Sequence, residues 1–317
     1  MKTDLIYGVE DRPPFKEALF AALQHLLAIF VAIITPPLII ASALKLDVEK
    51  TGFLVSMSLF ASGVSTFVQC RRFGPVGAGL LCIQGTSFSF IGPIIATGLV
   101  GGLPLIFGSC MAAAPIEMIV SRTFKYLRNI ITPLVSGIVV LLIGLSLIKV
   151  GIVSCSGGYS AMDNGTFGSW ENLSIAALVL LSVLFFNRCR NKYLRMSSIV
   201  LGLCLGYGLA FALGKVDMSS LNVEMLMSFN IPQPFKYGVE FNVSSFIAIG
   251  LVYLITAIEA TGDVTANSMI SGLPIEGDSY LNVFPAVSWQ TGSIPFLPES
   301  SIPFRTQSLP KIMVLSN

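Results

Sequence analysis

Eight long apolar stretches dominate this sequence and decide what it can fold into. They lie near residues 17–44, 52–70, 76–98, 103–121, 129–152, 173–187, 196–214 and 243–268, and most are close to the length of about twenty residues that a helix needs to cross a bilayer. Only 11% of the 317 residues are charged, whereas a soluble domain carries about 25%. The sequence therefore predicts an all-α polytopic membrane protein.

The charged residues between these stretches predict its orientation. Arginines such as Arg71, Arg122 and Arg188 lie in the loops after the second, fourth and sixth stretches, whereas the opposite loops contain lysines mixed with acids and no arginine. Loops rich in positive charge stay in the cytoplasm. Because the N-terminal segment lies on the same side as the arginine-rich loops, we expect a multi-pass plasma-membrane protein with a cytoplasmic N-terminus.

The third stretch has an irregular pattern. Glycines and prolines bracket residues 73–93, and the polar run Gln84-Gly-Thr-Ser87 lies between them. This pattern predicts an extended piece, broken near Gln84–Thr86, that leads into a half-helix. Broken spans are tolerated where protein or a cavity satisfies the freed backbone groups, and they mark transporter binding sites. A kinked packing helix is the alternative, since glycine is common in membrane spans.

The eighth stretch contains two carboxylic acids, Glu259 and Asp263. They are four residues apart and therefore share one helix face. Glu259 lies well inside the apolar run, where an ionisable residue usually faces a transport pathway. Asp263 lies nearer the cytoplasmic end, so simple solvation is the alternative for this residue.

Two further ionisable residues lie within apolar stretches. His25, in the first stretch, has either a role in a proton relay, as an imidazole can, or a structural hydrogen bond. Glu117, in the fourth stretch, either faces a pathway or pairs with Arg122 or Lys125 near the arginine-rich face. The six cysteines form no C-x-x-C pair and there is one histidine, so we predict neither a metal site nor a cofactor.

Five motifs occur in a fixed order along the chain. They are Gln24-His25-Leu-Leu-Ala, Gly74-Pro75-Val-Gly-Ala-Gly-Leu-Leu, Ile83-Gln-Gly-Thr-Ser-Phe-Ser-Phe90, Ile131-Thr-Pro-Leu-Val-Ser-Gly137 and Glu259-Ala-Thr-Gly-Asp263. Together they resemble the nucleobase–ascorbate transporter family, also called nucleobase:cation symporter-2, and in particular bacterial xanthine and uric acid permeases. The resemblance covers residues 5 to 281.

This resemblance implies an architecture of fourteen spans in two inverted repeats of seven, with a core domain, a gate domain and a homodimeric assembly. Under that scheme the chain holds a cytoplasmic N-terminus (1–16), the first repeat (17–214), an outer loop (215–242), and the eighth span with its cytoplasmic end (243–281). Family members move a purine or pyrimidine base together with protons or sodium ions.

The resemblance also implies roles for individual residues. Glu259 corresponds to the carboxylate that accepts hydrogen bonds from the base, and Phe88 to the aromatic residue that stacks on it, with Ser87 and Thr86 beside it. His25 and Asp263 correspond to polar positions that organise the site and couple transport to protons. We expect a xanthine or uric acid symporter driven by protons, with uracil or another base, or sodium coupling, as alternatives.

The last segment, residues 282–317, departs from the family pattern. It contains five prolines and no spanning run, and the family's tenth-span signature, Gln-Asn-x-Gly-x-x-x-x-Thr, does not occur. Loss of one base after the Asn282 codon explains the departure. The shifted frame forces alanine at the Trp289–Gln290 junction and glycine at Met313–Val314, as in the family. We expect a frameshifted, non-native and disordered tail.

Three functions compete on this basis. The first is a proton-coupled purine permease that is truncated and inactive, and the second is an active short carrier that completes its site across a dimer. The third is an intramembrane enzyme that uses Glu259 and Asp263 as paired acids. The enzyme hypothesis has no H-E-x-x-H or G-x-S-x-G motif to support it.

Overall fold

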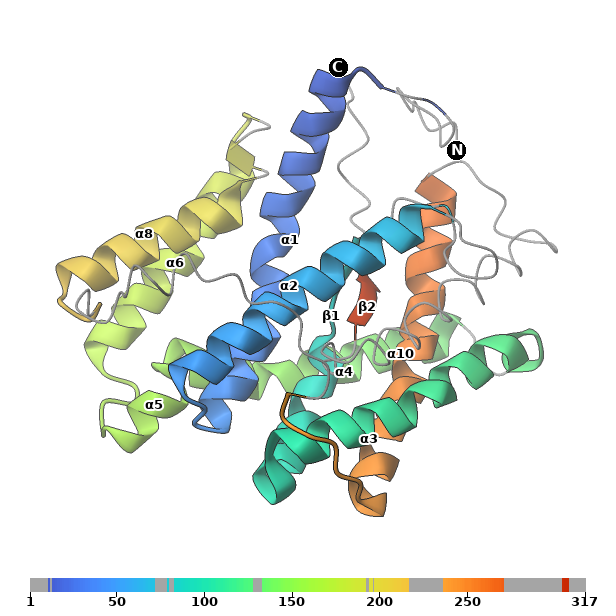
Figure 1. Cartoon of the computed structure of the whole chain (residues 1–317). Coiled ribbons are helices and arrows are strands. Elements are labelled where there is room, and N and C mark those ends of the chain that lie inside the picture. Colours follow the sequence, from blue (N-terminus) through green and yellow to red (C-terminus); the bar gives the residue numbers. More distant parts are fainter. Residues whose placement is uncertain are drawn as a thin grey trace. The chain divides into compact units, whose positions relative to one another are not determined.

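The computed structural model describes residues 11, 13–71, 79, 83–127, 133–191, 194–195, 197–216, 236–270 and 304–307 (Figure 1). Their fold is mainly helical. The helices are α1 (Phe15–Ala43), α2 (Val48–Cys70), α3 (Ile91–Leu127), α4 (Pro133–Cys155), α5 (Gly158–Asp163), α6 (Trp170–Arg188), α8 (Ser198–Ala212) and α10 (Val243–Ile270). Two strands, β1 (Ile83–Thr86) and β2 (Phe304–Gln307), and a short 3-10 helix, η1 (Phe88–Phe90), complete these elements.

Apolar helices occupy the predicted membrane stretches. Within the described residues, four helical segments are long and apolar enough to cross a membrane: Val48–Cys70, Phe88–Val120, Trp170–Arg188 and Val243–Ala260. Two shorter apolar helical segments, Ile29–Ala43 and Ser198–Ala212, coincide with parts of the predicted first and seventh stretches. A multi-pass membrane protein is therefore confirmed, whereas an arrangement of fourteen spans in two repeats stays a prediction.

The third stretch is broken where the sequence indicates. β1 covers Ile83–Thr86, η1 follows at Phe88–Phe90, and the regular helix begins only at Ile91. The predicted extended piece and half-helix are thus confirmed. A second interruption separates the predicted third and fourth stretches, because Gly101 and Gly102 have non-helical backbone angles inside α3. Gly102 has a φ of 66°, a conformation that glycine adopts without steric strain.

The chain divides into two compact units. The first contains residues 1–19, 32–144 and 232–317, and the second contains residues 20–31 and 145–231. In the first unit, α10 packs against α3, and η1 contacts both helices. Buried apolar side chains fill this interface, among them Phe90, Cys110, Ile249 and Tyr253. The core of the first unit therefore includes the end of the broken stretch, through Phe90 of η1.

In the second unit, α6 packs against α8 through small residues. A Cβ atom on Gly206 would lie 2.3 Å from the Cγ2 atom of Val179, and one on Gly202 would lie 2.5 Å from that of Val183. Two glycines four positions apart allow such a close approach of membrane helices. The glycines of α8 are thus explained by packing.

The tail contributes one strand, which differs from the expected disorder. β2 pairs antiparallel with β1, with Ile83 opposite Gln307 and Thr86 opposite Phe304 (Figure 1). An extended segment presents backbone N–H and C=O groups that need partners in an apolar environment. Pairing with β2 supplies partners to β1, and this need is a physical reason for the strand at Phe304–Gln307.

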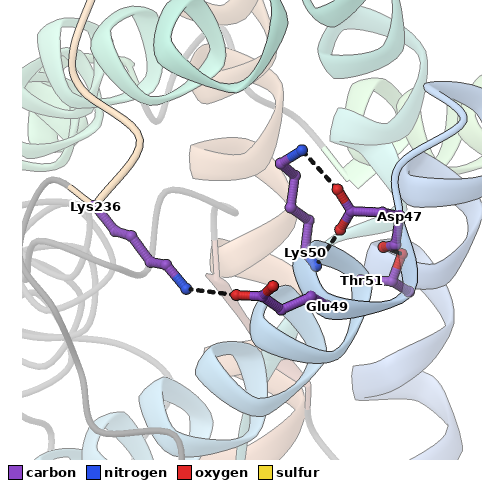
Figure 2. Close-up of polar contacts among 5 residues, drawn as sticks. All are labelled: Asp47, Glu49, Lys50, Thr51 and Lys236. Carbon is purple, nitrogen blue, oxygen red and sulfur yellow. Dashed lines mark hydrogen bonds and ion pairs between the residues drawn. The ribbon is translucent and has the colours of Figure 1, made fainter.

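A polar cluster links the start of α2 to the segment before α10 (Figure 2). Asp47 caps α2 by accepting a hydrogen bond from the Lys50 N–H at 2.7 Å, and the Lys50 ammonium also contacts its carboxylate at 2.6 Å. The hydrogen bonds from Lys50 lower the pKa of Asp47 below its usual range. Lys236 reaches Glu49 at 3.5 Å and lies 4.7 Å from the centre of the Phe53 ring. These contacts fix the segment that precedes α10 to the first turns of α2.

Candidate functional site

The candidate site is built where β1 gives way to η1. Ser87 has an extended backbone, and its hydroxyl oxygen accepts a hydrogen bond from the Ser89 N–H at 3.4 Å, so that it caps η1. Ser87 is buried and Phe88 is half-buried. A helix that begins inside the protein directs unpaired N–H groups and a partial positive charge toward the space before it. The break thus gathers polar donors and an aromatic ring.

Glu259 lies on α10 and contacts Ser89 of η1, directly after the break. Its side chain is 4% exposed, and the Ser89 hydroxyl lies 3.4 Å from its Oε2 atom in a long hydrogen bond. Next to this contact, Phe90 packs edge-on against Tyr253 of α10, with ring centres 4.9 Å apart. Phe88 and Glu259 thus lie on two contacting elements, η1 and α10, and Ser87 caps η1.

Thr86 fixes β1 to α1, and its predicted place beside a bound base stays a prediction. Its hydroxyl donates to the carbonyl oxygens of Ile33 at 2.9 Å and Ala32 at 3.2 Å in α1. α1 contains Pro36 and Pro37, and proline lacks the N–H that would bond the carbonyl four residues earlier. Thr86 thus satisfies the two carbonyls that these prolines leave open, and it fixes β1 to α1.

The surroundings of β1 contain further buried polar groups. The Gln84 N–H donates to the Thr66 hydroxyl at 3.0 Å, and the Ser62 hydroxyl donates to the Gln84 carbonyl. The side-chain amides of Gln84 and Gln69 are buried, and neither has a hydrogen-bond partner among the described residues. Because buried polar groups are normally paired, a polar ligand near β1 would gain hydrogen bonds from these amides.

The two predicted coupling residues are His25 and Asp263. His25 is half-buried on α1 and belongs to the second unit, whereas Glu259 and η1 belong to the first. Asp263 lies on α10 one turn beyond Glu259, and its side chain is outside the described part of the chain. Their roles stay predictions.

Ser89 was missed by the sequence analysis. The run Thr86-Ser-Phe-Ser-Phe90 offers three hydroxyls, and only the 3-10 geometry of η1 decides which of them reaches α10. In the described ranges, no group of three His, Cys, Asp or Glu side chains is placed to hold a metal ion. The arrangement presents a carboxylate, hydroxyls and an aromatic face, a set suited to a planar molecule with N–H donors.

Replacing Thr86 with valine is expected to destabilise the protein by about 1–3 kcal/mol, because the carbonyls of Ala32 and Ile33 lose their buried donor. Thermal unfolding of the detergent-purified chain measures this loss. Thr86→Ser keeps the hydroxyl and is the matched control. Equal stability of the valine and serine variants would contradict the proposed link between β1 and α1.

The comparisons with known proteins agree with one another. A protein-family model described as "Permease family" (Xan_ur_permease) matches residues 16–283. Xanthine permease XanQ of Escherichia coli (strain K12) is 48% identical over 287 residues, which cover 88% of this chain and 61% of that protein. Xanthine permease XanP of the same organism is 47% identical over 290 residues, which cover 88% of this chain and 62% of that protein.

A more distant relative has a related name. Uric acid permease PucJ of Bacillus subtilis (strain 168) is 34% identical over 257 residues, which cover 80% of this chain and 57% of that protein. The chain thus spans about three-fifths of the length of the curated relatives it matches. The matched range includes β1, η1 and the position of Glu259.

Proposed function

The chain belongs to the permease family, and from this premise we propose that it is the front part of a symporter that moves a purine base together with protons. The relatives are named as xanthine and uric acid permeases, and these two bases are the substrates we propose. Membership in a family of permeases decides against the intramembrane enzyme.

The contact between η1 and α10 is the observation that carries this proposal. This contact sets the buried carboxylate of Glu259 beside the Ser89 hydroxyl. Phe88, whose ring is half-buried, directly precedes Ser89 in the sequence. In the proposed complex, Glu259 accepts hydrogen bonds from ring N–H groups of the base, and Phe88 stacks on its face. Ser87, Thr86 and the start of η1 lie beside the base, and Thr86 also fixes β1 to α1.

The remaining assignments extend this proposal. His25 and Asp263 organise the site and couple transport to protons, and the N-terminus lies in the cytoplasm because the arginine-rich loops stay there. The complete protein forms a homodimer in the plasma membrane. Sodium coupling and a different base, such as uracil, are the alternatives, and uptake at different sodium concentrations distinguishes the two cations.

We also propose that residues 282–317 are the product of a lost base after the Asn282 codon. The family match ends at residue 283, directly after the position where the reading frame is proposed to change. The protein encoded after insertion of one base at that codon is called the frame-restored protein below. Sequencing the gene around the Asn282 codon and comparing the downstream frame tests this proposal.

Replacing Phe88 with alanine tests the base-binding role. If the ring stacks on the base, the frame-restored protein should lose about 1–3 kcal/mol of binding, or roughly fivefold to somewhat more than a hundredfold in affinity. The Michaelis constant for xanthine uptake measures the effect. Phe88→Tyr keeps an aromatic face and should retain most of the affinity. An unchanged constant in the alanine variant would remove Phe88 from the site.

A further inference from the structure

A second buried carboxylic acid lies in the interface between α3 and α10. Among the described residues, Glu117 and Glu259 are the two carboxylic acids that are buried, and Glu117 is 1% exposed. The function proposed above does not use Glu117. The sequence leaves two alternatives for it, a position that faces a pathway or a pair with Arg122 or Lys125, so its surroundings decide between them.

The position of Glu117 continues the apolar stripe of α3 that packs on α10. Buried residues of α3 recur at helical spacing as Leu103, Ile106, Cys110, Ala113 and Glu117, and residues spaced three and four apart lie on one helix face. At the neighbouring residue Ile116, α10 approaches α3 closely. A Cβ atom added to Gly250 of α10 would lie 2.7 Å from the Ile116 side chain. Glu117 therefore occupies a core position, not a solvated one.

The contacts of Glu117 are unusual for an ionised acid. Neither of its carboxyl oxygens has a hydrogen-bond partner among the described residues. Its described electrostatic neighbours are Glu259 and Tyr253, both on α10, and the buried Tyr253 hydroxyl also has no hydrogen-bond partner in the described ranges. Cys110 is the other titratable side chain on the same stripe, and it is buried as well.

Helix geometry argues against an ion pair of Glu117 with Arg122 or Lys125. Arg122 and Lys125 follow Glu117 by five and eight positions, whereas favourable pairs on a helix are three or four positions apart. The side chains of both cations lie outside the described part of the chain. A carboxyl group in an apolar interior is unfavourable in its ionised form unless it is paired, and an unpaired one is most stable when it is neutral.

We propose that Glu117 is a second proton-binding site, occupied at neutral pH and linked electrostatically to Glu259 across the α3–α10 interface. While Glu117 holds its proton it carries no charge, so it does not oppose the ionised form of Glu259 that accepts hydrogen bonds from a base. Loss of that proton places two like charges together and favours protonation of Glu259. The meaning of this link for transport rests on the proposed function, whereas the proton site itself does not.

The test uses the 317-residue chain in membrane vesicles and dicyclohexylcarbodiimide, an apolar reagent that modifies protonated carboxylic acids. Glu117 is the only carboxylic acid between Arg72 and Arg122, so mass spectrometry of the tryptic segment 73–122 identifies its modification without ambiguity. We expect modification at neutral pH that declines as the pH rises and is lost in Glu117→Gln. The exposed acids Glu49 and Glu171 should stay unmodified under the same conditions.

Two variants make the outcome decisive. In Glu259→Gln the like charge is gone, so the pH of half-maximal modification at Glu117 should fall; no shift would overturn the link. If segment 73–122 is not modified, infrared spectroscopy of Glu117→Gln decides. Loss of a protonated-carboxyl band at neutral pH upholds the site, and an unchanged band overturns it. Neither readout needs transport, so failure of the proposed function appears separately, as absent uptake by the frame-restored protein.

Discussion

Replacing Glu259 with glutamine in the frame-restored protein should abolish purine uptake while leaving the protein in the membrane. The carboxylate can accept hydrogen bonds at both oxygens, whereas an amide has one acceptor and presents donors on its other side. A hydrogen bond to a charged group contributes about 1.5–3 kcal/mol, which corresponds to roughly tenfold to a hundredfold in affinity.

Uptake of radiolabelled xanthine at substrate concentrations below saturation measures this effect, with immunoblots to confirm equal abundance. Glu240→Gln is the matched control, because Glu240 is exposed and precedes α10 by only a few residues. It should transport normally. Near-normal uptake by the Glu259 variant would refute the proposed role of the carboxylate.

The second large effect concerns the chain itself, which we expect not to transport any base. The family resemblance places the base between the third, eighth and tenth spans, and the tenth-span signature does not occur in this sequence. β2 supplies a backbone partner for β1 without the signature side chains. Glu259 therefore lacks a counterpart from the second repeat in this account.

Insertion of one base after the Asn282 codon should restore saturable uptake, because it returns the downstream codons to the family frame. The measurement compares xanthine and uric acid uptake by the unmodified and frame-restored proteins in a host without its own purine permeases. A silent change in the Asn282 codon is the control. Saturable uptake by the unmodified chain would favour the dimeric short carrier over the inactive fragment.

Much of the fold follows from sequence features that have a direct physical meaning. Bilayer thickness fixes the length of apolar stretches, and glycine and proline around Gln84–Ser87 indicate the break that β1 and η1 form. Glu259 stands out because a carboxylic acid inside an apolar run is unfavourable unless it has a partner or a pathway. Both features depend on residue type and position along one element.

The features that sequence analysis missed depend on contacts between elements. The role of Thr86 appears only when β1 lies against the carbonyls freed by Pro36 and Pro37 in α1. For Glu117 the sequence leaves a pathway-facing position and an ion pair both open, and its burial becomes visible only in the packing of α3 on α10. β2 was missed because composition records no preference for pairing with a strand that lies more than two hundred residues earlier.

The central claim is that η1 and α10 together bind a purine base. Equilibrium binding of radiolabelled xanthine to the purified frame-restored protein tests it most directly, with unlabelled uric acid and uracil as competitors. The account predicts saturable binding that uric acid displaces, that uracil displaces poorly, and that Phe88→Ala and Glu259→Gln each weaken. Absence of saturable purine binding by the folded protein, or binding that both substitutions leave unchanged, would contradict it.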